Sequence, residues 1–381
     1  LMTVRLAILG LGRGAVLTAP AFVSHPRIAL VTGCDPNAQA RAGFGKPSFA
    51  SAEELFADGA FDAVYIASPH EFHADHAIMA ARAGKHVLVE KPMAVTLAET
   101  TAMIAAAREA GTILMVGPSH GFNPPVALAA EIVASGDVGP ARMMHSYNFT
   151  DFLYRPRRPA ELDTARGGGV VLSQGTHQID MVRRIADSPV SSVSAWTGGW
   201  DARATEGAFT ALLNFENGAV ANLTYSGYAH YDSDVVAGWI GELGQAKDPQ
   251  AHGRARATLQ AVDEQTAKAA RTFAAHHETT APEHHERFGS LIISCEKADL
   301  ELTPQGVNIH GDTGMRSVAA PLPVAQRSNV VDAFVGAILD QEKPLFDGSW
   351  GRDSLAVCQA ILQSAREGRS VVPSELIPSD I

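Results

Sequence analysis

The sequence predicts an α/β protein in which a doubly wound parallel sheet is followed by an α+β part with a large, mostly antiparallel open sheet. Two observations lead to this prediction. Strand and helix signals alternate up to about residue 116, and strand-like runs follow one another after residue 190. The chain has 381 residues, more than one ordinary core accommodates. We therefore divide it into domains spanning residues 1–122 and 123–381.

The first part is expected to alternate five strands with helices. Strands are predicted over residues 6–9, 28–34, 63–67, 87–89 and 113–116, and helices over 15–24, 51–58, 74–83 and 97–110. Ser51 and Thr96 are residue types that cap helix N-termini. Ligands of such sheets bind beyond the carboxyl ends of the strands. The residues at those ends should therefore converge on one crevice: Gly10, Asp35, Ser68, Glu90 and Lys91.

The second part is expected to form one sheet with helices on one face. Strands are predicted over residues 141–148, 190–197, 208–215, 219–226, 290–294 and 299–303. Asn217-Gly218 indicates a hairpin between two of them. The Ala-rich stretch at 246–275 predicts a helical excursion, bounded by polar loops, that reaches to about residue 285. Closing helices over 330–339 and 355–366 are expected to pack back on the first part.

The glycine-rich turn after the first strand indicates a dinucleotide site. Gly10-x-Gly12-x-x-Ala15 is typical of a strand that turns into a helix over a pyrophosphate. Gly10 permits the tight turn, and Gly12 leaves room for phosphate at the helix N-terminus. Arg13, the next residue of the turn, is counted with the cofactor-binding residues.

Asp35 at the end of the second strand indicates which dinucleotide is bound. A carboxylate there accepts hydrogen bonds from the adenosine ribose and repels a 2′-phosphate. The alternative is an Asx turn before Pro36. Arg41 is close enough in sequence to accept a phosphate. We expect NAD as cofactor, with NADP less favoured.

Several further motifs resemble those of the Gfo/Idh/MocA oxidoreductases over nearly the whole chain. They are Gly10-x-Gly12, Ser68-Pro69 with His73, Glu90-Lys91-Pro92, and Gly167-Gly168-Gly169 leading to His177 and Asp180. The resemblance implies a Rossmann domain, an α/β substrate domain with an open sheet, and NAD(P)-linked hydride transfer. It also implies that Ser68, His73 and Glu90 shape the cofactor pocket.

Within that family the stretch 148–163, Ser173-Gln174 and 225–228 are similar to the phthalate 4,5-cis-dihydrodiol dehydrogenases. Ser173 stands where many sugar-oxidising members carry Asp, and His120-Gly121 where many carry Arg. We therefore expect NAD-dependent oxidation of a secondary alcohol on a cyclic carboxylated substrate, an aromatic-acid cis-dihydrodiol, to the catechol. The alternatives are oxidation of a ring-cleavage semialdehyde hemiacetal, a sugar or inositol dehydrogenase, and an NAD-binding regulator without activity.

Lys91 and His177 are the expected catalytic residues. Lys91 follows a buried strand, so its ammonium should lie beside the nicotinamide and favour the developing alkoxide. A neutral imidazole at His177 can remove the hydroxyl proton near neutral pH. Asp180 lies on the same helix face, where it orients His177 or binds solvent. Ser173, also on that face, is a candidate for a hydrogen bond to substrate.

A stiff basic loop is the expected substrate clamp. Arg155, Arg157 and Arg158 follow Tyr154 in a Pro-rich stretch, and arginine matches a carboxylate with two parallel hydrogen bonds. The alternative is a solvated loop or a subunit contact. Two further residues near strand ends complete the predicted substrate set: His120 and Asn148.

Charge and cysteine content narrow the partners. Thirty basic against 41 acidic residues give a net charge of −11 without a basic block, so nucleic acid and anionic membranes are not expected. A small anionic substrate needs only a local basic pocket. Cys34, Cys295 and Cys358 are far apart, which favours a reducing cytoplasm. We find no signal peptide or membrane-spanning run, and expect a homodimer or homotetramer formed through the open sheet.

Two histidine clusters raise the question of a metal. His70, His73 and His76 recur every third residue, which does not place all three on one helical face. His276-His277 and His284-His285 lie in a polar loop. We expect no metal site at either cluster.

Overall fold

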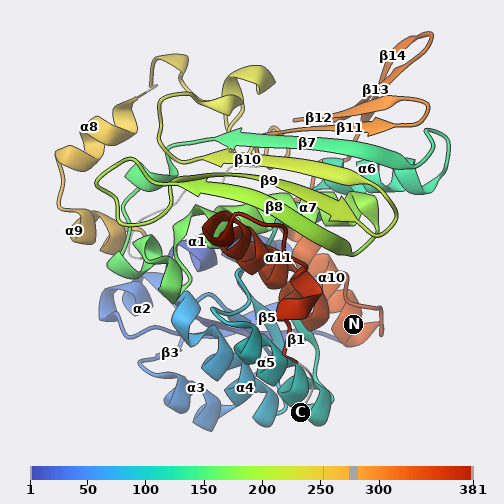
Figure 1. The fold of residues 1–381 in the computed structure, drawn as a ribbon. Helices are drawn as coiled ribbons and strands as arrows, with labels where there is room; N and C mark the ends of the chain where they lie inside the picture. Colours follow the sequence, from blue (N-terminus) through green and yellow to red (C-terminus); the bar gives the residue numbers. More distant parts are fainter. Residues whose placement is uncertain (1, 252, 274–281, 379–381) are drawn as a thin grey trace.

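Two sheets dominate the computed structural model, which describes residues 2–251, 253–273 and 282–378 (Figure 1). The first is a six-stranded sheet of order β3-β2-β1-β4-β5-β6, and all of its pairings are parallel. Its strands are β1 (Val4–Leu9), β2 (Ile28–Cys34), β3 (Ser48–Phe49), β4 (Ala63–Ile66), β5 (His86–Val89) and β6 (Leu114–Val116). The predicted Rossmann sheet is confirmed.

Five helices belong to this sheet: α1 (Arg13–Ser24), α2 (Ala38–Phe44), α3 (Ala52–Asp58), α4 (His73–Arg82) and α5 (Leu97–Ala110). The predicted caps form, because Ser51 accepts from Glu54 N and Thr96 accepts from Glu99 N. The short elements α2 and β3 were not predicted. A seven-residue helix and a two-residue strand carry too little periodicity to be recognised.

The second sheet has eight strands in the order β14-β13-β12-β11-β7-β10-β9-β8. Only β7 and β10 pair in parallel, so the predicted mostly antiparallel sheet is confirmed. The predicted Asn217-Gly218 hairpin joins β9 to β10. The strands are β7 (Ala141–Phe149), β8 (Val190–Gly198), β9 (Ala208–Phe215), β10 (Val220–Ser226), β11 (Ser290–Cys295), β12 (Asp299–Thr303), β13 (Gly306–Gly311) and β14 (Gly314–Ala319).

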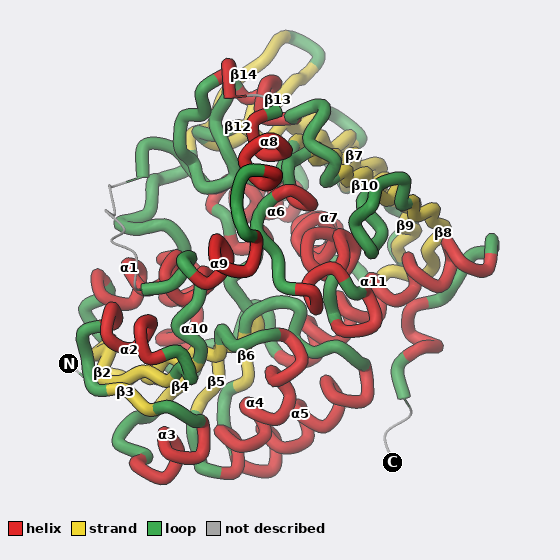
Figure 2. Tube along the Cα trace, turned by 90° about the vertical axis from the view of Figure 1, so that its left-hand side faces the viewer, coloured by secondary structure: helices red, strands yellow, loops and turns green. Residues whose placement is uncertain are grey.

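Helices cover one face of this sheet. They are α6 (Pro124–Ala134), α7 (Thr176–Ala186) and α11 (Gly348–Glu367), and Figure 2 shows them on the side that faces the first sheet. The cross-strand row Val193, Leu213, Ala221 and Met144 is buried beneath them, whereas the alternate row faces outward. Side chains alternate in this way when one face of a sheet meets a core.

The second half of the chain reaches back to the first at two places. Helix α10 (Ser328–Leu339) places Val330 and Phe334 in the same apolar cluster as Leu6 of β1. Up to residue 273, the described part of the predicted excursion contains two short α-helices, α8 (Arg254–Gln260) and α9 (Glu264–Ala269), rather than one long one. The ring of Phe273 lies 5.2 Å from that of Phe44 in α2.

Phe334 provides a test of the packing of α10. Its side chain is fully buried between α10 and the first sheet. Phe334→Ala should lower the free energy of unfolding by about 3–5 kcal/mol, because it removes buried apolar surface and leaves a cavity. Urea unfolding measures this change. Val324→Ala, at a side chain that is 81% exposed, is the control and should change stability little.

Candidate active site

The glycine-rich turn lies at the carboxyl end of β1 and has the backbone that its sequence predicts. Gly10 has φ of +95°, and a Cβ there would lie 2.5 Å from Ser68 N. A Cβ on Gly12 would meet nothing within 4 Å, so the space above it is open. The N-terminus of α1 has no side-chain cap and no acidic residue in its first turn. Free N–H groups facing open space fit a pyrophosphate.

Asp35 lines a cavity of about 770 Å³ beside this turn. Its Oδ1 accepts from Asn37 N and its Oδ2 from Leu11 N, both at 2.8 Å. The Asx turn therefore exists, and the carboxylate also anchors the glycine-rich turn. Arg41 donates to the Asp35 carbonyl at 2.6 Å. Other residues of the cavity are Gly10, Ser51, Ser68, Phe72 and His76.

Lys91 follows β5 and crosses to the second half of the chain. Its Nζ donates to the carbonyl of Ser173 at 2.7 Å, and desolvation lowers its pKa. Glu90 is turned the other way, towards α1, where its Oε1 accepts from Tyr65 Oη at 2.6 Å. His73 faces the carbonyls of Ser68 at 2.9 Å and Pro92 at 3.0 Å, so it ties together two strand-end loops.

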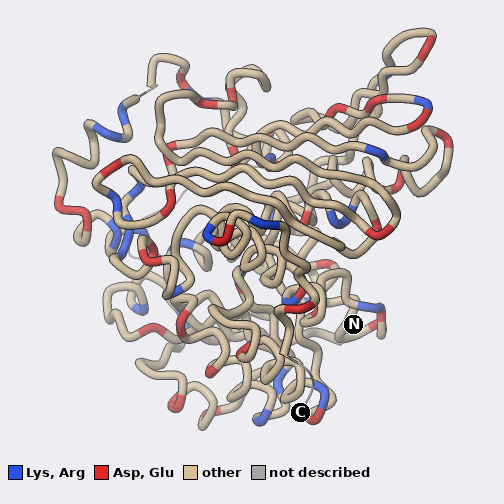
Figure 3. Tube along the Cα trace, viewed as in Figure 1, with Lys and Arg blue, Asp and Glu red and all other residues tan. Residues whose placement is uncertain are grey.

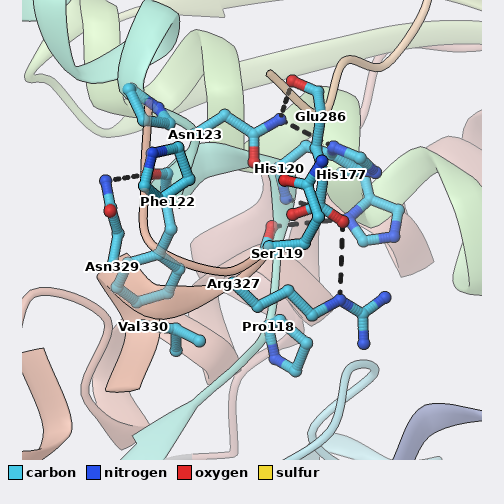
Figure 4. A pocket seen from close by; sticks show the side chains of 13 residues that line it. Pro118, Ser119, His120, Phe122, Asn123, His177, Glu286, Arg327, Asn329 and Val330 are labelled. Atoms are coloured by element: carbon cyan, nitrogen blue, oxygen red, sulfur yellow. Dashed lines mark hydrogen bonds and ion pairs between the residues drawn. The ribbon is translucent and has the colours of Figure 1, made fainter. Parts of the chain in front are cut away.

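His177 in α7 lines a small cavity of about 30 Å³ together with Ser119, His120 and Arg327 (Figure 4). Its ring contacts those of His120 at 4.6 Å and Phe288 at 4.9 Å. The Nδ1 atom accepts from the backbone N–H of His120 at 3.3 Å. Burial, together with the charge of Lys91, holds the pKa of His177 well below its ordinary value. The imidazole is therefore neutral, and its proton resides on Nε2.

Asp180 is linked to His177 through the hydroxyl group of Ser119. It accepts from Ser119 Oγ at 2.6 Å, and Ser119 Oγ lies 3.5 Å from His177 Nδ1. Ser354 Oγ and Trp350 Nε1 donate to its other oxygen. Burial raises the pKa of Asp180 despite these hydrogen bonds. Asp180 therefore holds neighbouring side chains in place through hydrogen bonds and does not bind solvent.

The three loop arginines are each paired with acidic side chains. Arg155 Nε donates to Asp151 at 2.7 Å, Arg157 lies 3.4 Å from Glu161, and Arg158 lies 3.6 Å from Glu71. Figure 3 shows acidic and basic positions side by side around this region. A substrate carboxylate would thus join existing ion pairs rather than meet unpaired arginines. The sequence did not indicate these ion pairs.

Comparison with known proteins identifies the family. A model described as "oxidoreductase family, NAD-binding Rossmann fold" matches residues 4–118, and the C-terminal domain model of the same family matches 126–247. The chain belongs to the Gfo/Idh/MocA oxidoreductase family. It is therefore a dehydrogenase with an NAD-binding Rossmann domain, as predicted. The open space at Gly12 and the free end of α1 agree with that cofactor.

The relatives of this family member include dehydrogenases named for cyclic compounds with two or more hydroxyl groups. A Comamonas testosteroni protein named 1-carboxy-3-chloro-3,4-dihydroxycyclohexa-1,5-diene dehydrogenase is 41% identical over 95% of each chain. A Bacillus subtilis scyllo-inositol 2-dehydrogenase (NAD⁺) is 30% identical over 63% of this chain and 72% of its own. The crystal structure of a Bordetella bronchiseptica RB50 protein, 41% identical, superposes with a TM-score of 0.92 over 97% of this chain and all of its own.

Glu242 and Arg327 belong to the site but were not predicted. Glu242 lies 3.5 Å from His120 and 3.3 Å from Arg155, and Arg327 lies 3.6 Å from Glu286 across the cavity. Both come from irregular segments, where no periodicity marks a functional position. The flanking Gly241 and Gly244 were the available signal for Glu242.

Two predicted substrate-binding residues form hydrogen bonds with residues that are not among the predicted site residues. Tyr154 Oη donates to Asp201, and Asn148 Oδ1 accepts from Ser233 Oγ.

Among the described residues, no group of three or more His, Cys, Asp or Glu is placed to hold a metal. His276 and His277 lie outside the described residues. No helix within the described ranges has the length and apolarity needed to cross a membrane.

Proposed function

We propose that this dehydrogenase oxidises a secondary alcohol of a carboxylated cyclic cis-diol, derived from an aromatic acid, to the corresponding catechol with NAD. The main support is the 41% identity, over 95% of both chains, with the C. testosteroni enzyme named for a carboxylated dihydroxycyclohexadiene. Ser173 supports a diol over a sugar, since it replaces the carboxylate of many sugar-oxidising relatives. The ketone formed first would tautomerise, and regained aromaticity would favour oxidation.

We assign distinct tasks to Lys91 and His177, the two residues proposed to be catalytic. When bound, NAD accepts the hydride that leaves the carbon bearing the hydroxyl group. Desolvation lowers the pKa of Lys91, which makes its amine better able to take the hydroxyl proton. The Nδ1 atom of His177 already accepts a hydrogen bond, so Nε2–H donates to the substrate oxygen. This assignment differs from the sequence-based expectation that His177 removes the proton.

The basic loop supports an anionic substrate through two of its three arginines. Arg155 lies 3.3 Å from Glu242, and the charge of Arg157 contributes to the lowered pKa of Lys91, so both support a positive potential near Lys91. Arg158 instead pairs with Glu71 and Glu161 at the edge of the loop. We therefore assign the substrate carboxylate to Arg155 and Arg157.

The outer face of the large sheet supports self-association. Its exposed side chains include Met143, Trp196, Leu212 and Ile292. Uncovered apolar side chains on a sheet face mark interaction surfaces, so we propose a dimer or tetramer formed through this face. Analytical ultracentrifugation would measure the oligomeric state.

The three cysteines are free, and we propose a reducing compartment such as the cytoplasm.

Lys91→Ala should slow the hydride step about a hundredfold or more while NAD still binds, since a positioned acid–base group contributes about that much. Single-turnover kinetics with a carboxylated cis-dihydrodiol measures the step, and a polyol panel tests the sugar alternative. Lys297→Ala, at an exposed lysine, is the control. Near-normal turnover without Lys91 would exclude the proposed proton transfer.

NAD should bind at least about tenfold tighter than NADP, equivalent to about 1.4 kcal/mol, because the Asp35 carboxylate repels a 2′-phosphate. Calorimetric titration with both cofactors measures the ratio. Asp35→Asn keeps a hydrogen-bond acceptor but loses the charge, so it should narrow the difference. Equal affinities of the parent protein for NAD and NADP would contradict the proposal that Asp35 binds the adenosine ribose.

Arg157→Ala should raise KM for the carboxylated diol about tenfold and leave KM for an uncharged diol of the same ring nearly unchanged, because a charge-assisted hydrogen bond contributes about 1.5–3 kcal/mol. Arg157→Lys should restore affinity only in part, since lysine lacks the planar fork. Arg158→Ala is the matched control from the same loop. If Arg157→Ala affects both diols alike, the loop is structural.

A further inference from the structure

A backbone carbonyl determines how His120 is protonated. Asn123 Nδ2 donates to the carbonyl of Glu286 and to His120 Nδ1, both at 2.8 Å. A flipped amide would place two acceptors, Oδ1 and the Glu286 carbonyl, against each other. The amide orientation is therefore fixed, and His120 Nδ1 must accept. The Nε2 atom of His120 then carries a proton and can donate it in a hydrogen bond.

Glu242 is the acceptor for that proton. Its Oε1 faces His120 Nε2 at 3.5 Å, and its Oε2 faces Arg155 NH1 at 3.3 Å. Arg155 is held in turn by Asp151. Desolvation opposes ionisation of Glu242, but the hydrogen bond from His120 and the charges of Arg155 and Lys91 lower its pKa below the ordinary range. Glu242 is thus an anion within the site.

We propose that Glu242 is a positioning residue of the reaction: it accepts the Nε2–H of His120 and supplies the negative charge that offsets Arg155 and Lys91. His120 passes this constraint to the catalytic histidine, because its backbone N–H donates to His177 Nδ1 and the two rings are in contact. One carboxylate thereby holds the protonation states on both sides of the reacting centre.

The charge of Glu242 acts on Lys91 against several neighbours. Desolvation lowers the pKa of Lys91, as do the charges of Arg327 and Arg157, whereas Glu90 and Glu242 raise it. The two imidazoles that interact electrostatically with Lys91, His70 and His177, have pKa values lowered mainly by burial, so they are neutral. Loss of either carboxylate charge must therefore lower the pKa of Lys91.

The decisive experiment titrates Lys91 directly. The ¹³Cε signal of Lys91 in lysine-labelled, NAD-loaded protein, assigned with Lys91→Arg, reports its protonation without any substrate. Glu242→Gln should lower the pKa of Lys91 by about one unit, because it removes a negative charge that raises this pKa. Glu242→Asp keeps the charge and should restore most of the shift. Glu367→Gln, in an exposed ion pair at the end of α11, is the control and should change nothing.

The same variants should change the pH profile of kcat/KM for the cis-diol. The rise or fall of kcat/KM that reflects the titration of Lys91 should occur at lower pH in Glu242→Gln. It should stay near the parent position in Glu242→Asp. The expected change in the pH profile rests on the proposed function, because it needs turnover of the cis-diol. The ¹³C titration needs no substrate and does not rest on it. An unshifted Lys91 signal in a folded Glu242→Gln protein would overturn the role of Glu242. An inactive parent with a shifted signal would instead contradict the proposed substrate.

Discussion

The hydrogen bond from Lys91 Nζ to the Ser173 carbonyl joins the two halves of the molecule at the reacting centre. Lys91 follows a strand of the parallel sheet, and Ser173 precedes α7 beneath the antiparallel sheet. The ammonium therefore depends on both halves for its position. Its lowered pKa follows from the same arrangement, because docking of the second half removes water from it.

Charge balance is the second constraint on the crevice. The loop arginines, Arg327 and Lys91 would repel one another in a partly desolvated site, and acidic side chains from several segments are placed among them. Glu242 belongs to this set and also accepts from His120. Such a site can receive an anionic substrate only where the existing pairs leave hydrogen-bonding capacity. Arg155 and Arg157 each use Nε and NH1 for hydrogen bonds within the protein.

The parallel sheet and its glycine-rich turn were predictable because their signals are local. Gly10 is required by its own backbone angle, and Thr96 caps a helix that begins at the next residue. The antiparallel sheet was predictable from alternation and from the Asn217-Gly218 turn. Strands β13 and β14 were missed, since few of their residues are apolar and buried, and every residue of β14 is exposed or only partly buried. The Ala-rich excursion was predicted as helical in composition, but Asp263 caps a second, separate helix.

The sequence by itself determined the family and the cofactor turn, and it led to the proposal of Lys91 and His177 as the catalytic pair, because each depends on residues close in the chain or on a recognisable motif. Only the tertiary structure revealed that the loop arginines are already paired, that Asp180 reaches His177 through Ser119, and that Glu242 faces His120. These contacts join residues more than 50 positions apart, or depend on which carboxylate lies nearest in space. Hydrogen bonds and ion pairs act over a few ångströms, and sequence spacing does not specify those distances between separate loops.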